Sequence, residues 1–339
     1  MLIGMWRAAF LCAMVALPIS AAPTQFVFKQ LVVGGSSDVQ VAAINNKIQY
    51  VGSYLDNNGS HGFMFSGGVP TLLAPGPGCS GVMPAAVNVR TTILGFVACG
   101  NPPEPGLFDW WRGVYNPNCC FALGQPNPDY HVGINATGVV FFNTASLGSG
   151  NNGWLLGTPL NFASIYPPGS NAEICSINSG GIVAGVATGS DVPPIFFQGP
   201  GATFTTFAPP AVASISGCAF INDAGGIAGG YVDKTGTPHG FVYDGSGFVL
   251  FGMPVTATSV TVDAYNNKGR AVGSYFDPAK QMWYLFWYNG ASVTVFGHFM
   301  ARSQLSLALN DSGILMLAVR NLDGGQSRSY RVLCVGVGC

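Results

Sequence analysis

Short apolar segments alternate with polar turns along most of the chain. The segments are rich in Val, Ile, Phe and Tyr, and the turns contain Gly, Asn, Asp and Pro. One unit shows the pattern clearly, with segments Cys218–Asn222, Gly226–Asp233, His239–Asp244 and Gly247–Gly252. Segments of this kind predict β-strands. An α-solenoid is excluded because no unit has helical periodicity over about ten residues.

The unit repeats seven times. A short apolar motif that ends in asparagine marks each copy, at Asn45, Asn88, Asn135, Asn178, Asn222, Asn266 and Asn310, with spacings of 43, 47, 43, 44, 44 and 44 residues. Four strands in about 44 residues make one blade of a β-propeller. The sequence therefore predicts an all-β fold, a seven-bladed β-propeller of four-stranded blades. A pair of β-sandwiches stays an alternative, although seven equal units favour a ring.

The two ends of the chain complement each other. The last unit, from Leu307 onward, has three predicted strands, and the segment Gln25–Val33 is a strand without a blade. If this N-terminal strand docks as the outer strand of the last blade, every blade has four strands and no open sheet edge interrupts the ring. We expect the propeller to be closed in this way.

The repeated asparagines have a local physical role. In five units Asn begins a four-residue turn and Gly ends it, as in Asn222-Asp-Ala-Gly225. Asn can bond the backbone two residues on, and Gly tolerates positive φ. The asparagines are therefore interpreted as turn formers and not as a catalytic ring. Units 1 and 2 have Ile48 and Thr91 in place of the glycine, so we expect their turns to differ.

These motifs carry a family resemblance. Ile-Asn-x-x-Gly, a following Val/Ala-Gly-x-Tyr and then His-Gly-Phe occur together in Asn222–Phe241, and His-Gly-Phe occurs again at His61-Gly62-Phe63. The pattern resembles the HAF-type extracellular repeat of exported bacterial proteins, and it covers essentially all of the chain after its first residues. The resemblance implies an exported repeat protein, and it supplies neither a reaction nor catalytic residues.

The N-terminus and the composition indicate where the protein acts. Arg7, the apolar run Ala8–Leu17 and the small residues Ser20-Ala21-Ala22 have the layout of a secretory signal peptide, so we divide the chain into a signal peptide (1–22) and one propeller domain (23–339). The run is too short to span a membrane. We expect a secreted, periplasmic or extracellular monomer. Charged residues are only 8% of the chain and form no basic stripe, which argues against nucleic-acid binding.

Outside the signal peptide the chain has eight cysteines, an even number that predicts disulfides in an oxidising compartment. Three pairs are candidates, Cys79–Cys99, Cys175–Cys218 and Cys334–Cys339. Cys119 and Cys120 are adjacent and their partners stay open. Neither a Cys-x-x-Cys pair nor ligand spacing among the four histidines is present. We therefore expect no metal site, and we expect no cofactor.

Sequence motifs for catalysis are missing. The chain contains no Gly-x-Ser-x-Gly elbow, no His-Glu-x-x-His helix and no phosphate-binding loop with lysine. His61 and His239 start equivalent strands, and Asp56, Asp233 and Asp277 follow equivalent strands, so we interpret both sets as structural parts of the repeat. Glu104 and Glu173 are the only glutamates, and His131 and His298 have no repeat role.

Unit 2 breaks the sevenfold regularity most. It is the longest unit, and we interpret Gly100–Trp111 as an inserted loop between its second and third strands. Exposed aromatic side chains can stack on sugars or apolar partners. The candidate ligand contacts are therefore Trp110 and Trp111, flanked by Asp109 and Arg112. The alternative is that the two tryptophans fill a gap between blades and bind nothing.

Two hypotheses for the function follow from the sequence. The preferred one is a non-catalytic binding or surface-interaction scaffold for an unidentified extracellular glycan or protein. The alternative is an extracellular enzyme, a glycosidase or lyase, that acts on polysaccharide through loop carboxylates such as Asp109, Asp129 and Glu104.

Overall fold

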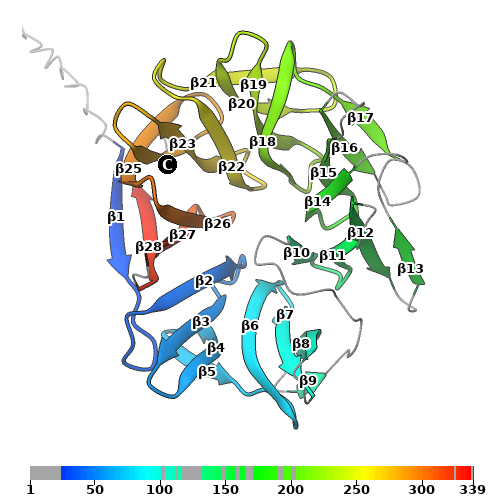
Figure 1. The fold of residues 1–339 in the computed structure, drawn as a ribbon, viewed down its shortest axis with the longest axis vertical. Coiled ribbons are helices and arrows are strands. Elements are labelled where there is room, and N and C mark those ends of the chain that lie inside the picture. The colour runs from blue at the N-terminus through cyan, green and yellow to red at the C-terminus, as the bar shows by residue number, and fades with distance from the viewer. Residues whose placement is uncertain are drawn as a thin grey trace, which may run out of the picture.

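The computed structural model describes residues 24–100, 104–111, 114–116, 131–146, 150–157, 161–164, 171–188, 194–199, 204–323, 326–336 and 339. The regular structure of these residues is entirely β. Seven four-stranded antiparallel sheets surround a common axis (Figure 1). The predicted seven-bladed β-propeller is confirmed.

Each of the first six blades is four consecutive strands. Blade 1 contains β2 (Val39–Ile44), β3 (Tyr50–Asp56), β4 (Gly59–Ser66) and β5 (Val69–Leu73); blade 2 contains β6 (Cys79–Val87), β7 (Thr92–Cys99), β8 (Glu104–Trp111) and β9 (Val114–Asn116). Blade 3 contains β10 (Val132–Ile134), β11 (Val140–Ser146), β12 (Gly150–Gly157) and β13 (Asn161–Ser164); blade 4 contains β14 (Asn171–Ile177), β15 (Val183–Thr188), β16 (Ile195–Gly199) and β17 (Thr205–Phe207). Blade 5 contains β18 (Val212–Ile221), β19 (Ile227–Asp233), β20 (Pro238–Tyr243) and β21 (Phe248–Gly252); blade 6 contains β22 (Ser259–Tyr265), β23 (Ala271–Asp277), β24 (Met282–Tyr288) and β25 (Val293–Met300). The first strand of each blade lies nearest the axis (Figure 1).

Blade 7 combines the two ends of the described chain. Its strands are β26 (Ser303–Leu309), β27 (Ile314–Asn321), β28 (Arg328–Val335) and β1 (Gln25–Gln30), and β1 pairs antiparallel with β28 along its whole length (Figure 1). Phe26 of β1 also stacks on Phe296 of blade 6, with ring centroids 4.4 Å apart. The N-terminal strand therefore contacts two blades.

Side chains between adjacent blades form the core. Phe63 and Phe241, the aromatic residues of the two His-Gly-Phe triplets, are fully buried. Phe241 packs edge-on against Phe196 of blade 4, with ring centroids 4.8 Å apart. The aromatic positions of the repeat therefore join one blade to the next, and each such contact adds to the apolar burial that stabilises the ring.

The marker asparagines form the predicted turns. The Asn266 side-chain oxygen accepts hydrogen bonds from the backbone nitrogens of Lys268 and Arg270, both at 3.0 Å, and Gly269 closes the turn. The same turn is present in units 1 and 2, where Ile48 and Thr91 take positive φ values of 61° and 66°. The expectation of different turns is therefore wrong, because the ring imposes one geometry on all seven units despite unfavourable residues.

The asparagines also join the blades. Each side-chain amide donates to the backbone carbonyl of the equivalent asparagine in the next blade, over Asn45, Asn88, Asn135, Asn178, Asn222, Asn266, Asn310 and back to Asn45. All seven asparagines are buried. The ring is thus closed by side-chain hydrogen bonds at one end of the axis, which we call the Asn-turn end.

Bulges distort the innermost strands near their marker asparagines. The pairing of β14 with β15 skips Cys175, and the pairing of β22 with β23 skips Asp263, each three residues before its asparagine. The bulged strands press on glycines of the second strands: a Cβ atom at Gly185 would lie 2.1 Å from the backbone oxygen of Glu173. This close approach explains the glycine of the Val/Ala-Gly-x-Tyr motif.

The segment interpreted as a loop in unit 2 is mostly strand. Glu104–Trp111 is β8, the third strand of its blade, and it pairs with β7 from Thr92 to Cys99. The His-Gly-Phe triplets lie in the third strands of blades 1 and 5, and β8 lacks such a triplet, so the sequence did not mark it as a strand. In blade 2 the third strand comes earlier, and Val114 begins the fourth.

Candidate functional site in the axial channel

The Asn-turn end of the axis holds a small cavity of about 220 Å³. One apolar or aromatic residue from each blade lines it just before the marker asparagine, namely Ile44, Val87, Ile134, Ile177, Ile221, Tyr265 and Leu309. Polar residues just after the asparagines form the rim, where the Asn267 amide donates to the carboxylates of Asp223 and Asp311 at 2.9 and 3.0 Å. These rim side chains therefore serve as hydrogen-bond partners for one another.

A second group of polar residues lies deeper along the innermost strands. His131 precedes β10, Glu173 lies on β14, Cys218 on β18 and Asp263 on β22, three to five residues before their marker asparagines. At about 3.3 Å per residue, this places the group roughly 10–17 Å along the strands from the asparagines. The group therefore lies along the innermost strands on the side away from the Asn-turn end.

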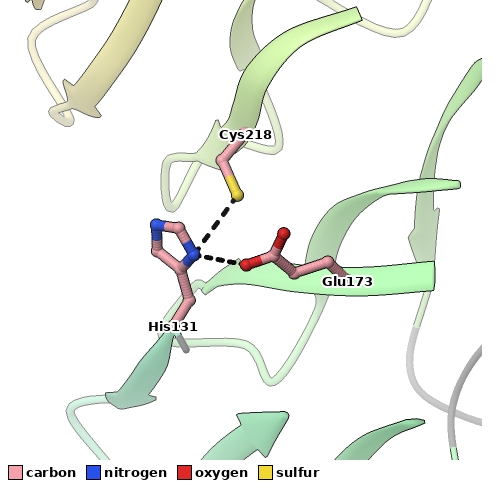
Figure 2. Close-up of side chains that lie close together, drawn as sticks. All are labelled: His131, Glu173 and Cys218. Carbon is pink, nitrogen blue, oxygen red and sulfur yellow. Dashed lines mark hydrogen bonds and ion pairs between the residues drawn. The ribbon is translucent and has the colours of Figure 1, made fainter. Parts of the chain in front are cut away.

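His131, Glu173 and Cys218 converge from three blades (Figure 2). The His131 Nδ1 atom lies 2.5 Å from Glu173 Oε1 and 3.5 Å from Cys218 Sγ. The side chains of His131 and Glu173 are 42% and 27% exposed, so solvent reaches both. Three residues distant in sequence thus present one imidazole, one carboxylate and one sulfur at a single point.

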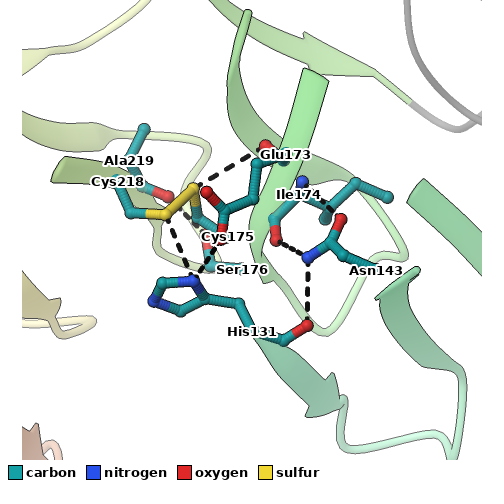
Figure 3. Close-up of polar contacts among 8 residues, drawn as sticks. All are labelled: His131, Asn143, Glu173, Ile174, Cys175, Ser176, Cys218 and Ala219. Atoms are coloured by element: carbon teal, nitrogen blue, oxygen red, sulfur yellow. Dashed lines mark hydrogen bonds and ion pairs between the residues drawn. A yellow bond between two sulfur atoms is a disulfide. The ribbon is translucent and has the colours of Figure 1, made fainter. Parts of the chain in front are cut away.

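The buried amide of Asn143, on β11, fixes the backbone of this group. Its nitrogen donates to the carbonyl oxygens of His131 at 3.0 Å and Ile174 at 2.7 Å, and its oxygen accepts from the Ile174 nitrogen at 2.9 Å (Figure 3). One side chain therefore ties the residue before β10 to the residue after Glu173. Because Asn143 is only 4% exposed, water competes little for these bonds.

Cys218 is bonded to Cys175, the bulged residue of β14 (Figure 3). The disulfide joins blades 4 and 5, and both cysteines are at most 5% exposed. The structure also contains Cys79–Cys99 and Cys334–Cys339, so it holds the three pairs expected from the sequence. Cys119 and Cys120 lie outside the described residues.

Glu173 fixes the orientation of the His131 ring. A carboxylate only accepts hydrogen bonds, so Nδ1 carries the proton and Nε2 of the neutral ring is an acceptor. Within the part of the chain that the structure describes, Nε2 has no hydrogen-bond partner. An oriented imidazole with a free nitrogen can accept a hydrogen bond or a proton from a bound molecule.

Asp263 brings a second, unusual group to the channel. Burial raises the pKa of its carboxyl to about 7, and the positive charge of protonated His131 opposes the rise. Among the described residues none is hydrogen-bonded to this carboxyl, so nothing local stabilises its ionised form. Carboxyls with strongly raised pKa values concentrate at functional sites.

The ligating atoms of His131, Glu173 and Cys218 all lie within 4.8 Å of one another. With the disulfide intact, Cys218 offers no thiolate, and the histidine and glutamate alone are a poor set for a metal. No local motif marks the cluster, because its members come from three blades and have no regular spacing in the sequence.

Of the residues proposed from the sequence in unit 2, those that the structure describes do not lie on the innermost strand. Asp109 and Glu104 belong to β8, the third strand of blade 2. The backbone of Trp110 and Trp111 is in the same strand, while their side chains lie outside the described residues. Arg112 and Asp129 also lie outside them. Ligand binding by the tryptophans stays a prediction.

The template histidines have the structural role that we expected. His61 Nε2 lies 3.0 Å from Asp56 Oδ1, and His239 Nε2 lies 2.9 Å from Asp233 Oδ2. Asp233 also accepts bonds from the turn that follows β19, and these bonds hold its pKa well below the usual range. Each histidine ring stacks on a tyrosine of the preceding strand, with centroids 5.1 Å apart. Each histidine–aspartate pair therefore holds the second and third strands of its own blade together.

Sequence reasoning named His131 and Glu173 without assigning them a role, and it missed Asp263. One signal was present: titratable residues occur three to five positions before the marker asparagine in units 3, 4 and 6, where units 1, 2 and 7 have only Gln, Val, Ala, Met, Pro, Leu and Ser. The innermost strands face the axis in every propeller blade. Charged residues confined to neighbouring units therefore indicate an asymmetric channel.

Comparison with known proteins supports the fold and nothing finer. No protein-family model matches the chain, and no curated protein matches it. A catalytically inactive variant of virginiamycin B lyase from Staphylococcus aureus, solved with quinupristin, superimposes with a TM-score of 0.57 at 12% identity, over 92% of this chain and 100% of that one. A streptogramin B lyase structure matches equally well, with a TM-score of 0.57 at 12% identity over 91% and 98%. At this identity the likeness establishes the propeller alone.

A prolyl endopeptidase structure also matches, with a TM-score of 0.53 and 10% identity, over 88% of this chain and 47% of that one. Its propeller-like part is thus about half of a larger protein. In the described residues of the present chain, no helix is long and apolar enough to cross a membrane. The resemblance to HAF-type repeats stays a prediction.

Proposed function

We propose that the protein is an exported binding scaffold whose ligand enters the axial channel and contacts His131 and Asp263. The observation that carries the proposal is the presence, at neighbouring innermost strands, of two polar groups without a hydrogen-bond partner among the described residues, the His131 Nε2 atom and the Asp263 carboxyl. The His131 side chain is 42% exposed, so a ligand can replace the water at these groups and bond to both.

The chemistry of the two groups favours a neutral, hydroxyl-rich ligand. The neutral imidazole accepts a hydrogen bond at Nε2, and a protonated Asp263 donates one, which together suit the hydroxyl groups of a sugar. Carboxylates at Glu173, Asp223 and Asp311 along the same axis disfavour an anion. A channel also suits the end of a glycan chain better than the broad surface of a folded protein. We therefore propose a glycan ligand.

Three disulfides support export, since such bonds persist in oxidising compartments. The proposed signal peptide and the proposed extracellular or periplasmic location fit this chemistry. The proposed ligand contacts of Trp110, Trp111, Asp109 and Arg112 form a second binding hypothesis, which the same experiment can separate from the first.

The experiment is a glycan-array screen of the mature chain, followed by calorimetric titration of whichever glycan binds. We expect His131→Ala and Asp263→Ala each to weaken binding at least about tenfold, since each removes a hydrogen bond to the ligand. His61→Ala is the matched control, because that histidine belongs to the structural template. Unchanged affinity in both channel variants, with binding lost in Trp110→Ala/Trp111→Ala, would transfer the site to blade 2 and refute the channel.

A second candidate function is acid–base catalysis on the same glycan. The oriented His131–Glu173 pair favours it, because a carboxylate that holds Nδ1 leaves Nε2 placed to take a proton, and a protonated Asp263 is a potential proton donor. In this hypothesis His131 and Asp263 take the place of the loop carboxylates that the sequence analysis suggested as catalytic groups. A panel of glycosidase and lyase substrates tests this hypothesis. Catalysis is supported if His131→Ala abolishes turnover and His61→Ala retains it. The scaffold is supported if a glycan that binds is not turned over.

A further inference from the structure

The Cys175–Cys218 disulfide lies beside two other metal-ligating side chains, because His131 and Glu173 converge on Cys218. Within the described chain, the group of His131, Glu173 and Cys218 is the one place where three such residues converge. Cys175 is bonded to Cys218 and so belongs to the same point in space (Figure 3). Breaking the disulfide would add two thiols to one imidazole and one carboxylate.

We propose that reduction of the Cys175–Cys218 disulfide converts this cluster into a Zn²⁺ site, with His131, Glu173 and the two cysteines as its four ligands. The donor set is the reason for zinc. Zinc takes four ligands drawn from thiolate sulfur, imidazole nitrogen and carboxylate oxygen, whereas calcium and magnesium require oxygen ligands alone. This inference is independent of the proposed glycan ligand.

The spacing of the ligands suits a tetrahedral ion. With Zn–N of about 2.1 Å and Zn–S of about 2.3 Å, the tetrahedral edge from nitrogen to sulfur is about 3.6 Å. His131 Nδ1 and Cys218 Sγ are 3.5 Å apart. The Glu173 carboxylate, now 2.5 Å from Nδ1, has to move away by about an ångström to make room for the ion. A side-chain rotation of this partly exposed glutamate supplies the movement.

The surroundings hold the ligands in place. Asn143 fixes the backbone at His131 and at Ile174, the residue between Glu173 and Cys175. Both cysteines lie at bulges or irregular pairings of their strands, and bulges turn side chains away from the regular pleat. Their Cα atoms are 5.6 Å apart. Ligands fixed through the backbone in this way need little reorganisation to bind a metal.

The two forms of the site exchange by balanced chemistry. A dithiol reductant transfers two electrons and two protons to the disulfide, giving two cysteine thiols and the oxidised reductant. Zn²⁺ then displaces both thiol protons and forms two zinc–sulfur bonds, and the His131 proton moves through solvent from Nδ1 to Nε2, so that Nδ1 and the Glu173 carboxylate complete the four ligands. In the reverse direction, a disulfide oxidant accepts two electrons from the thiolates, the sulfur–sulfur bond forms again and Zn²⁺ is released. The site therefore binds metal only when reduced.

The test uses Co²⁺ as a spectroscopic substitute for Zn²⁺. The mature chain with Cys119→Ser/Cys120→Ser, which removes two cysteines outside the described residues, is reduced with a phosphine and titrated with Co²⁺. We expect one tightly bound ion with the charge-transfer absorption of a thiolate–cobalt bond, and none in the oxidised chain. Zn²⁺ should displace the cobalt and should raise the melting temperature of the reduced chain.

Matched variants assign the ligands. Adding Cys175→Ser/Cys218→Ser should abolish the absorption, whereas Cys79→Ser/Cys99→Ser, at a disulfide within blade 2, should leave it unchanged. His131→Ala keeps both cysteines and should weaken Co²⁺ binding at least about tenfold. The proposal is wrong if the reduced chain lacks the absorption, if it survives the loss of Cys175 and Cys218, or if the reduced chain unfolds equally with and without Zn²⁺.

Discussion

The side-chain amide of Asn310, in blade 7, donates a hydrogen bond to the backbone carbonyl of Asn45, in blade 1, at 3.2 Å. The two residues are 265 positions apart, and their bond is the last of seven equivalent bonds around the axis. Each asparagine thus does two jobs, since its oxygen shapes its own turn and its nitrogen holds the next blade. This double role explains an invariant asparagine better than turn formation alone.

Because of this double role, we expect the removal of one asparagine of the ring to lower the free energy of unfolding substantially. Asn266→Ala loses two turn bonds and leaves the buried Asn310 carbonyl without its 2.9 Å donor. We expect the free energy of unfolding to fall by about 2–4 kcal/mol. Asn289→Ala is the matched control, because Asn289 caps an exposed turn through its oxygen and donates to no other blade. Asn289→Ala should lower the free energy of unfolding by less than about 1 kcal/mol. If urea unfolding shows the same loss for both variants, the inter-blade hydrogen bond makes no contribution.

The first turn carries strain that a single substitution can relieve. Ile48 is β-branched, is 40% exposed and has a φ of 61°, a conformation that disfavours L-residues with branched side chains. Ile48→Gly should therefore raise the free energy of unfolding by about 1 kcal/mol, net of the extra flexibility of glycine in the unfolded chain.

Thr91→Gly is the comparison, measured by thermal and urea unfolding. Thr91 has the same backbone conformation, but its hydroxyl donates to the Gln49 side chain at 3.0 Å. The gain from relieved strain is offset by this lost bond, so Thr91→Gly should gain less than Ile48→Gly. A destabilised Ile48→Gly would show that the turn bears no strain.

The fold was predictable because its information is local and repeated. A constant spacing of asparagines, each followed by apolar segments and turn residues, encodes one blade seven times. The features that were predicted incorrectly also have physical explanations. Ile48 and Thr91 were expected to change their turns, but the closed ring imposes the common geometry on them. In unit 2 the third strand was misplaced, because β8 lacks the His-Gly-Phe triplet that marks this strand in blades 1 and 5.

The candidate site was not predictable by motif, because its members lie in different blades. Glu173 and His131 meet only when β14 and β10 take adjacent places around the axis, and no spacing in the sequence records that adjacency. The disulfide between Cys175 and Cys218 was easier to predict, because both cysteines have a definite position relative to a repeated asparagine. Positions counted from the repeat marker therefore carry more information about the channel than conventional motifs.

The raised pKa of Asp263 gives the protein a distinct pH dependence. The carboxyl has a pKa of about 7 in the folded chain and about 3.9 when unfolded. Its stabilising contribution is therefore full below about pH 4 and is lost as the pH rises through 7. Asp263→Asn should remove this loss and raise stability above pH 7, by at most about 4 kcal/mol.

Asp244→Asn is the control with the opposite sign. Turn hydrogen bonds from Ser246 lower the pKa of Asp244 to about 2, so its contribution is present above about pH 4 and is lost as the pH falls toward 2. Urea unfolding between pH 2 and pH 9 measures both variants. An Asp263→Asn curve parallel to that of the wild type between about pH 4 and pH 7 would show that the folded carboxyl is ionised throughout that range.

The N-terminal strand β1 tests how the ring depends on its closure. Its removal exposes the edge of β28 along the register from Tyr330 to Val335, and it withdraws Phe26 from its stack on Phe296. Deletion of residues 23–33 also removes Leu31 and Val33, which are buried against blade 1. We expect the melting temperature to fall by at least about 5 °C, because a loss of several kcal/mol corresponds to a shift of this size in a domain of this length.

A pair of point variants in β1 separates packing from strand pairing. Phe26→Ala keeps the backbone ladder and should lower the free energy of unfolding by about 2 kcal/mol, since the ring is only partly buried between blades 6 and 7. Val27→Ala, on the same strand with a side chain 52% exposed, should cost less than about 0.5 kcal/mol. Thermal melts and size-exclusion chromatography follow all three proteins. If the deletion variant keeps the melting temperature of the full chain, the ring does not need β1, and blade 7 is stable with three strands.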